Sequence, residues 1–188
     1  MKTSSICIRY DSQSYNKNQF DEIYLPGINI KIEKLKQKTV DTNAVILITS
    51  TAVTLFGVGF FSKAGEKAGE KVGEAIGQDI VNAYKKFKEK LLNALFSAKS
   101  RGSQRLGLII TSEEIGSPEV QIYVQPNSNA AAEALLDSAQ DIYNGVVIYI
   151  KKHSLKEITR FVVALEQDGQ HIRSFYFISK NEDVFFSE

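Results

Sequence analysis

The sequence of 188 residues has one cysteine, two histidines, three prolines and no tryptophan. The single cysteine, Cys7, excludes a disulfide within the chain, and with only His153 and His171 beside it the usual Cys/His zinc site cannot be built. Residues 1–10 lack the apolar stretch of a cleavable secretory signal. We therefore expect a reducing, cytoplasmic environment and no metal or other cofactor.

The short motifs of common catalytic and nucleotide-binding chemistries are also missing from the sequence. It contains no P-loop, no dinucleotide fingerprint, no HExxH and no GxSxG. A formal net charge of +1 gives no overall field that would attract nucleic acid. Cys7 lies in an apolar strand pattern, which disfavours a thiol nucleophile served by a histidine. We therefore expect a protein that is not an enzyme, has no catalytic residue and does not bind nucleic acid.

The residues that are present predict an ordinary globular domain, because 43% are hydrophobic and 24% charged. In the N-terminal part, residues 5–10 and 28–33 alternate apolar and polar side chains, which predicts two strands that pair. Four lysines surround the end of the second strand: Lys31, Lys34, Lys36 and Lys38. They fit either a solvated strand end or a positive flank on the cytosolic side of a bilayer.

Residues 42–62 form an uncharged run of 21 residues. A helix of that length would reach about 31 Å, close to the thickness of the hydrocarbon core of a bilayer. Seven Thr, Ser or Asn residues and two glycines lower its hydropathy, so the run also fits a buried helix, or a strand over residues 45–48 followed by a turn and a helix. The candidates for membrane insertion are its large apolar residues: Val45, Ile46, Leu47, Ile48, Val53, Leu55, Phe56, Phe60 and Phe61.

A tetrad repeat, KAGE-KAGE-KVGE-AIGQ over residues 63–78, follows the run directly and places Gly65, Gly69, Gly73 and Gly77 four residues apart. Each glycine costs about 1 kcal/mol relative to alanine inside a helix, so a helix that keeps four of them should have something packed against its backbone. The partner of this helix-packing row is either the protein's own sheet or, as in small-xxx-small contacts, a second helix in an oligomer or a membrane.

Beyond the repeat, residues 79–95 have the spacing of an amphipathic helix, and the chain then becomes β-rich. Strands are predicted over residues 106–111, 120–124, 146–151, 160–166 and 172–179, with a short apolar edge strand over residues 184–186. Asp168-Gly169 predicts a hairpin between two of them. A helix is predicted over residues 130–143, capped by Asn129 and stopped by Asn144-Gly145.

The order of a short β segment, a Thr- and Gly-rich hydrophobic segment, the glycine-repeat helix and a β-rich remainder resembles small membrane-associating accessory or effector proteins of bacterial conflict (defence) systems. Residues 42–90 carry this resemblance, through the glycine-zipper-like helix only. It implies a non-enzymatic role in membrane targeting or assembly, and it transfers no catalytic residue.

Taken together, the sequence predicts an α+β fold: a mainly antiparallel sheet with a long helical region at residues 42–98 and one further helix at about 130–143. Residues 1–40 add strands to the sheet, residues 41–98 form the hydrophobic and glycine-repeat region, and residues 99–188 form the β-rich portion of the same domain. The leading functional hypothesis is a pore-forming or effector-type protein that associates with a membrane or self-assembles through its glycine-zipper helix. The alternative is a soluble protein–protein interaction module whose helices are core.

The expected partners follow from these two hypotheses. The first predicts a homo-oligomer and contact with lipid at the inner face of a membrane. The second predicts a partner protein bound at an exposed sheet edge.

Overall fold

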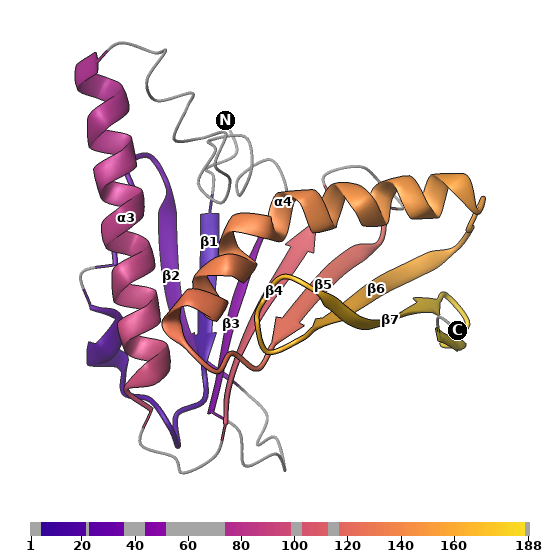
Figure 1. The fold of residues 1–188 in the computed structure, drawn as a ribbon, viewed down its shortest axis with the longest axis horizontal. Helices are drawn as coiled ribbons and strands as arrows, with labels where there is room; N and C mark the ends of the chain where they lie inside the picture. The colour runs from indigo at the N-terminus through magenta and orange to yellow at the C-terminus, as the bar shows by residue number, and fades with distance from the viewer. Residues whose placement is uncertain are drawn as a thin grey trace.

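Within the described residues, the fold is one eight-stranded sheet with two α-helices on one of its faces (Figure 1). The computed structural model describes residues 5–21, 23–35, 44–51, 74–98, 103–112 and 117–186. The elements, in chain order, are β1 (Ser5–Tyr10), the 3-10 helix η1 (Lys17–Phe20), β2 (Asn29–Lys34), β3 (Ala44–Thr51), α3 (Glu74–Phe96), β4 (Gln104–Thr111), β5 (Glu119–Val124), α4 (Asn129–Lys152), β6 (Ile158–Leu165), β7 (Ile172–Ser179) and β8 (Val184–Phe186).

The strands lie in the order β2-β1-β3-β4-β5-β6-β7-β8, so only the first two depart from chain order. Three neighbouring pairs are parallel, namely β1/β2, β3/β4 and β5/β6, and the other four are antiparallel. The predicted α+β class with a mainly antiparallel sheet is therefore confirmed. The predicted pairing of β1 with β2 is also confirmed, with the two strands running in the same direction.

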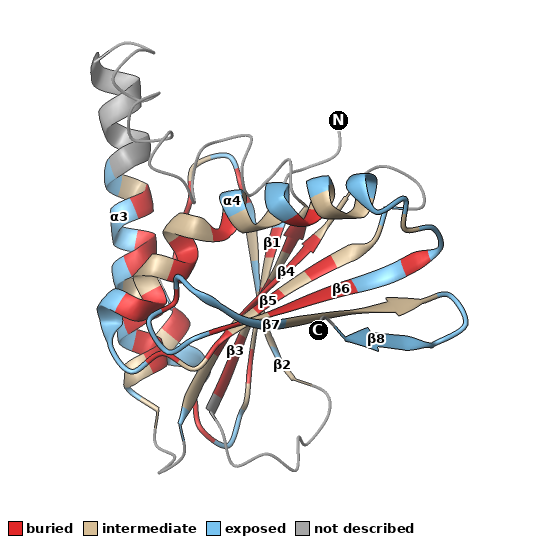
Figure 2. Cartoon of the chain, turned by 45° about the vertical axis from the view of Figure 1, so that its right-hand side comes forward, coloured by how far each residue is buried: buried red, intermediate tan, exposed pale blue. Residues whose placement is uncertain are grey.

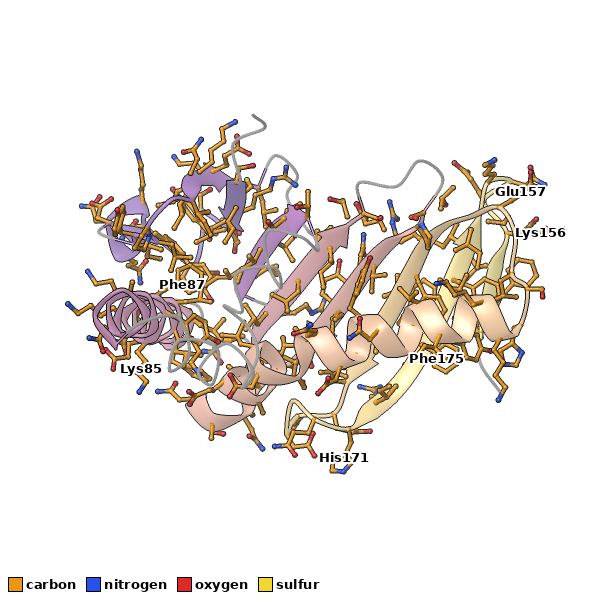
Figure 3. All side chains as sticks on the ribbon, turned by 90° about the horizontal axis from the view of Figure 1, so that it is seen from above. Lys85, Phe87, Lys156, Glu157, His171 and Phe175 are labelled. Carbon is orange, nitrogen blue, oxygen red and sulfur yellow. The ribbon has the colours of Figure 1, made fainter. Side chains whose placement is uncertain are left out.

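Each helix connects two neighbouring parallel strands, since such strands need a crossover connection. Helix α3 lies between β3 and β4 in the chain, and α4 lies between β5 and β6. Seen from above, both helices lie on the same side of the sheet (Figure 3). The arrangement gives the sheet one face packed on helices and one face without a described helix over it.

The core lies between the helices and the sheet, and its side chains follow the period of each element. Phe87, Leu91 and Leu95 of α3 are spaced by four residues and are buried. The strands contribute every second residue to the same cluster, such as Ile6 and Ile8 of β1.

Between the helices, the Lys88 ammonium group of α3 is nearly buried and reaches the Glu133 carboxylate at 2.6 Å and the Asp137 carboxylate at 3.1 Å.

Helix α4 is longer than the sequence predicts, and the strand predicted over residues 146–151 is wrong because these residues are its last turns. Gly145 does not stop the helix: a Cβ there would meet nothing within 4 Å, so its cost is only the intrinsic one of about 1 kcal/mol. Val146 is buried, and Tyr149 and Ile150 pack against the core at helical spacing. Burial of these side chains outweighs their preference for strands.

Within the region 42–98 that is expected to be helical, residues 44–51 form strand β3, the alternative that their β-branched residues favour. Strand β3 lies inside the sheet between β1 and β4, and Ile46 and Ile48 are completely buried. Helix α3 begins at Glu74, inside the tetrad repeat. The remainder of the expected helical region, residues 52–73, lies outside the described residues.

Candidate interaction edge

The membrane-insertion candidates fall into two groups. Val45, Ile46, Leu47 and Ile48 belong to β3, where Ile46 and Ile48 are core residues under the helices. Val53, Leu55, Phe56, Phe60 and Phe61 lie outside the described residues. In the part of the chain that the structure describes, no helix combines the length and the apolar character needed to cross a membrane.

The glycine row is similarly divided. Gly65, Gly69 and Gly73 lie outside the described residues, whereas Gly77 occupies the first turn of α3. The end of the repeat is thus helical, as the repeat predicts. Whether the row packs on another backbone stays a prediction.

The two outer strands of the sheet, β2 and β8, have no further strand beside them among the described residues. All three residues of β8 are exposed apolar side chains: Val184 is 48% exposed, Phe185 46% and Phe186 76% (Figure 2). An apolar strand at a free edge is uncommon, because such edges recruit other chains and are usually protected by charge. The edge of β8 is therefore the candidate functional site.

Phe185 is the outermost ring of an aromatic ladder that crosses three strands on the helix-covered face. Phe161 of β6 lies opposite Phe177 of β7, with ring centroids 6.0 Å apart, and Phe177 lies opposite Phe185, with centroids 5.0 Å apart. Both pairs are stacked. Tyr149 of α4 packs edge-on against Phe161 at 5.9 Å, which holds the inner end of the ladder under the helix. The outer end, at Phe185, is half open to solvent.

On the other face of the same strand, Val184 and Phe186 point away from the helices, since neighbouring residues of a strand alternate between faces. The Phe186 ring contacts the Tyr176 ring with centroids 5.7 Å apart, and no other ring contact is found for Phe186 within the described ranges. The edge therefore offers apolar surface on both faces of the sheet.

The backbone of β8 adds directional hydrogen-bonding groups to this apolar surface. The Ser179 amide donates to the Asp183 carbonyl at 3.0 Å, which marks the first hydrogen-bonded rung between β7 and β8. In an antiparallel ladder such rungs alternate with rungs that lack hydrogen bonds, so the next bonded rung is Phe177 with Phe185. The amide and carbonyl groups of Val184 and Phe186 consequently point outward, toward the free edge.

The edge of β2 carries charge instead. Arg9 of β1 reaches the Glu33 carboxylate at 3.4 Å, and Lys31 binds the same carboxylate. Hydrogen bonds from Lys31 and then from the Cys7 thiol lower the pKa of Glu33 to about 2. Lys34, the last residue of β2, is exposed. Charged side chains on an edge strand disfavour the addition of another strand.

Cys7 contacts the same carboxylate: its thiol donates a hydrogen bond to Glu33 at 3.5 Å. Burial raises the pKa of this thiol, which is the opposite of what a nucleophile requires. His153 caps the end of α4, and His171 lies in the β6–β7 turn, bonded to Asp168. The three residues belong to different parts of the fold, and no group of three potential metal ligands forms among the described residues.

A shallow depression of about 510 Å³ lies over β4 to β7. Its lining includes Arg105, Gln121, Tyr123, Arg173 and Tyr176. The Tyr123 hydroxyl donates to Gln121 at 2.7 Å, and burial raises the pKa of Tyr123. The phenol of Tyr123 therefore stays protonated and bonded to its neighbour.

Sequence reasoning predicted β8 as an edge strand but assigned it no function. The signal was present, since three successive apolar residues, Val184-Phe185-Phe186, follow Glu182 and Asp183. What the sequence does not reveal is the position of β8 at the end of the sheet and the ring contacts behind it.

Comparison of the chain with protein-family models, with curated proteins and with solved structures finds no significant match in any of the three.

Proposed function

We propose that this protein is a non-enzymatic interaction module that binds an extended polypeptide segment along the outer edge of β8. The observation that carries the proposal is the combination of three exposed apolar side chains with outward-pointing backbone groups at one free edge. In recognition by strand addition, the main chain supplies affinity and alternate side chains supply specificity. This is the alternative in which the helices form core, as α3 and α4 do.

The chemistry of the edge defines the bound segment. Its backbone should pair with the amide and carbonyl groups of Val184 and Phe186. It should carry an apolar or aromatic residue opposite Phe185, where the ladder ends, because cross-strand aromatic pairs contribute about 0.5–1.5 kcal/mol beyond the area they bury. Since β8 has only three residues, the interface is small and we expect a dissociation constant in roughly the micromolar range.

The proposal can be tested with extended peptides selected from a random library against the purified full chain. Selected peptides should alternate apolar residues, and N-methylation of the peptide amides that face β8 should abolish binding while methylation of the intervening amides should not. Phe186→Lys should remove binding. The matched control is Ile148→Lys, because Ile148 is 64% exposed but lies on α4.

The location of the bound peptide is read from hydrogen exchange. The amides of Val184 and Phe186 should become protected in the complex. Peptides that bind equally well to the Phe186→Lys variant, or that protect another part of the chain, would show that the edge of β8 is not the binding site.

A second function, association with a membrane or with other copies through the glycine row, is favoured by one observation: the last five residues of the tetrad repeat, Glu74 to Gln78, belong to α3, and Gly77 is among them. Its test is co-sedimentation of the protein with liposomes. Gly69→Leu with Gly73→Leu should abolish lipid binding and leave the sheet folded. Absence of the unmodified protein from the lipid pellet would remove this second function.

A further inference from the structure

We infer that the segment bound at the edge of β8 is β8 of a second copy, paired antiparallel about a twofold axis through Phe185. This inference rests on the proposed function, because it uses the same edge and names its occupant. The dimer would continue the eight-stranded sheet of one copy directly into the sheet of the other. Closed twofold dimers are the commonest assemblies of identical chains, and in them one surface patch must complement itself.

The backbone of β8 fits such self-pairing in one register best. With the axis at Phe185, Val184 of each copy lies opposite Phe186 of the other, and both residues have outward-pointing groups. Each of the two opposed pairs can then exchange two hydrogen bonds. An axis at Val184 or at Phe186 would pair only one of the three β8 residues with an outward-facing counterpart within the strand.

The side chains match in the same register. Phe185 meets its own counterpart at a rung without hydrogen bonds, where side chains approach most closely, with Cβ atoms about 4.5–5.5 Å apart. The ladder of Phe161, Phe177 and Phe185 thereby joins its copy to form a continuous row of six rings. On the opposite face, Val184 packs beside Phe186 of the second copy. Every side chain of the strand thus meets an apolar one.

The other free edge, β2, is a poorer partner for β8. Four antiparallel pairs separate β2 from β8 across the sheet, so the two strands run in the same direction. A head-to-tail contact that keeps the helices on one side would therefore be parallel. It would place Val184 and Phe186, on the face away from the helices, beside Lys31 and Glu33, which lie on that same face with Arg9. Charged groups would then lie against apolar ones and lose solvation.

The acidic residues before β8 give the dimer a distinctive dependence on salt. Glu182 and Asp183 are exposed and lie next to the contact in both copies. The antiparallel register puts the two Asp183 residues at opposite ends of the contact, about 13 Å apart along the strands. Their repulsion therefore weakens the dimer at low salt and is screened at 0.1 M, where the Debye length is about 10 Å. Raising the salt concentration should therefore lower the dissociation constant of the dimer a few-fold. A contact between the acidic start of β8 and the basic β2 would instead be weakened by salt.

The first experiment measures mass against concentration by analytical ultracentrifugation of the full chain. The unmodified protein should pass from monomer to dimer in the micromolar range, with no larger species. Phe185→Lys should raise the dissociation constant at least about 30-fold, since the axis brings two such residues together. Phe186→Lys, a change at a more exposed position, should do the same. Ile148→Lys should dimerise like the unmodified protein, and circular dichroism confirms that each variant is folded.

The second experiment determines the register with cysteines in a Cys7→Ser background. Phe185→Cys should form a covalent dimer on oxidation, because residues on the axis have Cα atoms about 4.5 Å apart and can form a disulfide. Phe186→Cys should not, since each copy of residue 186 faces Val184 and the two lie about 7–8 Å apart diagonally. Crosslinking through residue 186 alone would overturn the proposed register.

The outcomes separate this inference from the proposed function. A monomer at all concentrations that still binds selected peptides at β8 would overturn the dimer and leave the proposed function intact. A monomer that binds no peptide would overturn both. A dimer that persists in both lysine variants would show that the copies meet through another surface, and the inference would then be wrong.

Discussion

The two free edges of the sheet differ in how they meet solvent. The edge of β2 carries Lys31 and Lys34 and holds Glu33 in ion pairs with Lys31 and Arg9. The edge of β8 presents Val184, Phe185 and Phe186, and the described acidic residues Glu182 and Asp183 directly precede the strand. A free edge can always accept another strand, so its side chains decide whether it does. Under the proposed function, this difference makes the edge of β8 the one that associates, while the charges of β2 protect the other edge.

The support behind the two edges also differs. Ile30 and Ile32 of β2 pack against the core, which η1 and α3 help to form. The β8 edge is connected to α4 by the aromatic ladder. The ring contacts therefore hold the position of the apolar edge, whose side chains stay exposed. A preorganised edge lowers the entropy that a binding partner must lose.

The largest expected effect comes from disturbing the contact between α4 and the β6–β7 turn, at the start of β7, the strand whose end pairs with β8. Gly169 has φ +73°, and a Cβ there would lie 1.9 Å from the Ala131 carbonyl oxygen of α4. Gly169→Ala should therefore lower the free energy of unfolding by about 3 kcal/mol or more, combining strain at positive φ with a steric clash. Gly145→Ala is the matched control, because it lies in a helix with open space around it and should raise stability by about 0.5–1 kcal/mol. Denaturant unfolding measures both.

Removing the middle ring of the aromatic ladder should have the next largest effect. Phe177→Ala removes the ring between Phe161 and Phe185, and because Phe177 is only partly buried we expect a loss of about 2–3 kcal/mol. Ile32→Ala makes the corresponding change behind the β2 edge and should cost about 1–2 kcal/mol. Equal losses of unfolding free energy in the two variants, measured by urea unfolding, would contradict a larger contribution of the aromatic ladder to stability. Phe177→Ala should also weaken association, whereas Ile32→Ala should not.

Making the β2 edge apolar should reduce the difference between the edges. Lys31→Val with Lys34→Val removes both exposed lysines of that strand, and surface changes of this kind usually alter stability by less than about 0.5 kcal/mol. With two apolar edges, the protein should form species larger than a dimer, detectable by light scattering. Lys85→Val with Lys86→Val, on the exposed face of α3, is the control for lost charge alone. Identical behaviour of the two double variants would show that the lysines of β2 do not protect its edge.

The smallest effect is a dependence of the β2 edge on pH. The folded-state pKa of Glu33 is about 2, below its ordinary value of 4.5, so its stabilising contribution is complete above pH 4.5 and is lost as the pH falls toward 2. Amide exchange in β2 should accelerate over that range relative to β8. Glu33→Gln should remove this difference in pH dependence. Parallel acceleration in both strands would mean that acid loosens the sheet as a whole.

Much of the sheet could be predicted from the sequence, because alternation of apolar and polar residues indicates a strand whichever strands lie beside it. Strand β1 and the hairpin of β6 and β7 around Asp168-Gly169 follow directly from this pattern and from the turn residues. The C-terminal half of α4 could not be predicted. Its residues Val146, Ile148 and Ile150 prefer strands, and only the packing of Val146 and Ile150 against the core makes the helix favourable.

The candidate site could be predicted only in part. Three apolar residues in a row predict a strand, but they do not reveal which strand lies beside them or whether the far side is free. That depends on β7 being the only neighbour of β8 among the described residues, a property of the whole sheet. Conversely, the glycine row is conspicuous in the sequence, and only its last member, Gly77, lies within the described residues.

The agreement between strand order and chain order from β3 to β8 has a consequence for synthesis on the ribosome. Each strand from β4 to β8, as it emerges, pairs with the strand made just before it, so this part of the sheet can grow one strand at a time. At each of these stages the newest strand is the edge strand of the nascent sheet, and β8 replaces β7 as that edge strand. Assembly between copies through β8 would therefore follow completion of the sheet and would not compete with its growth.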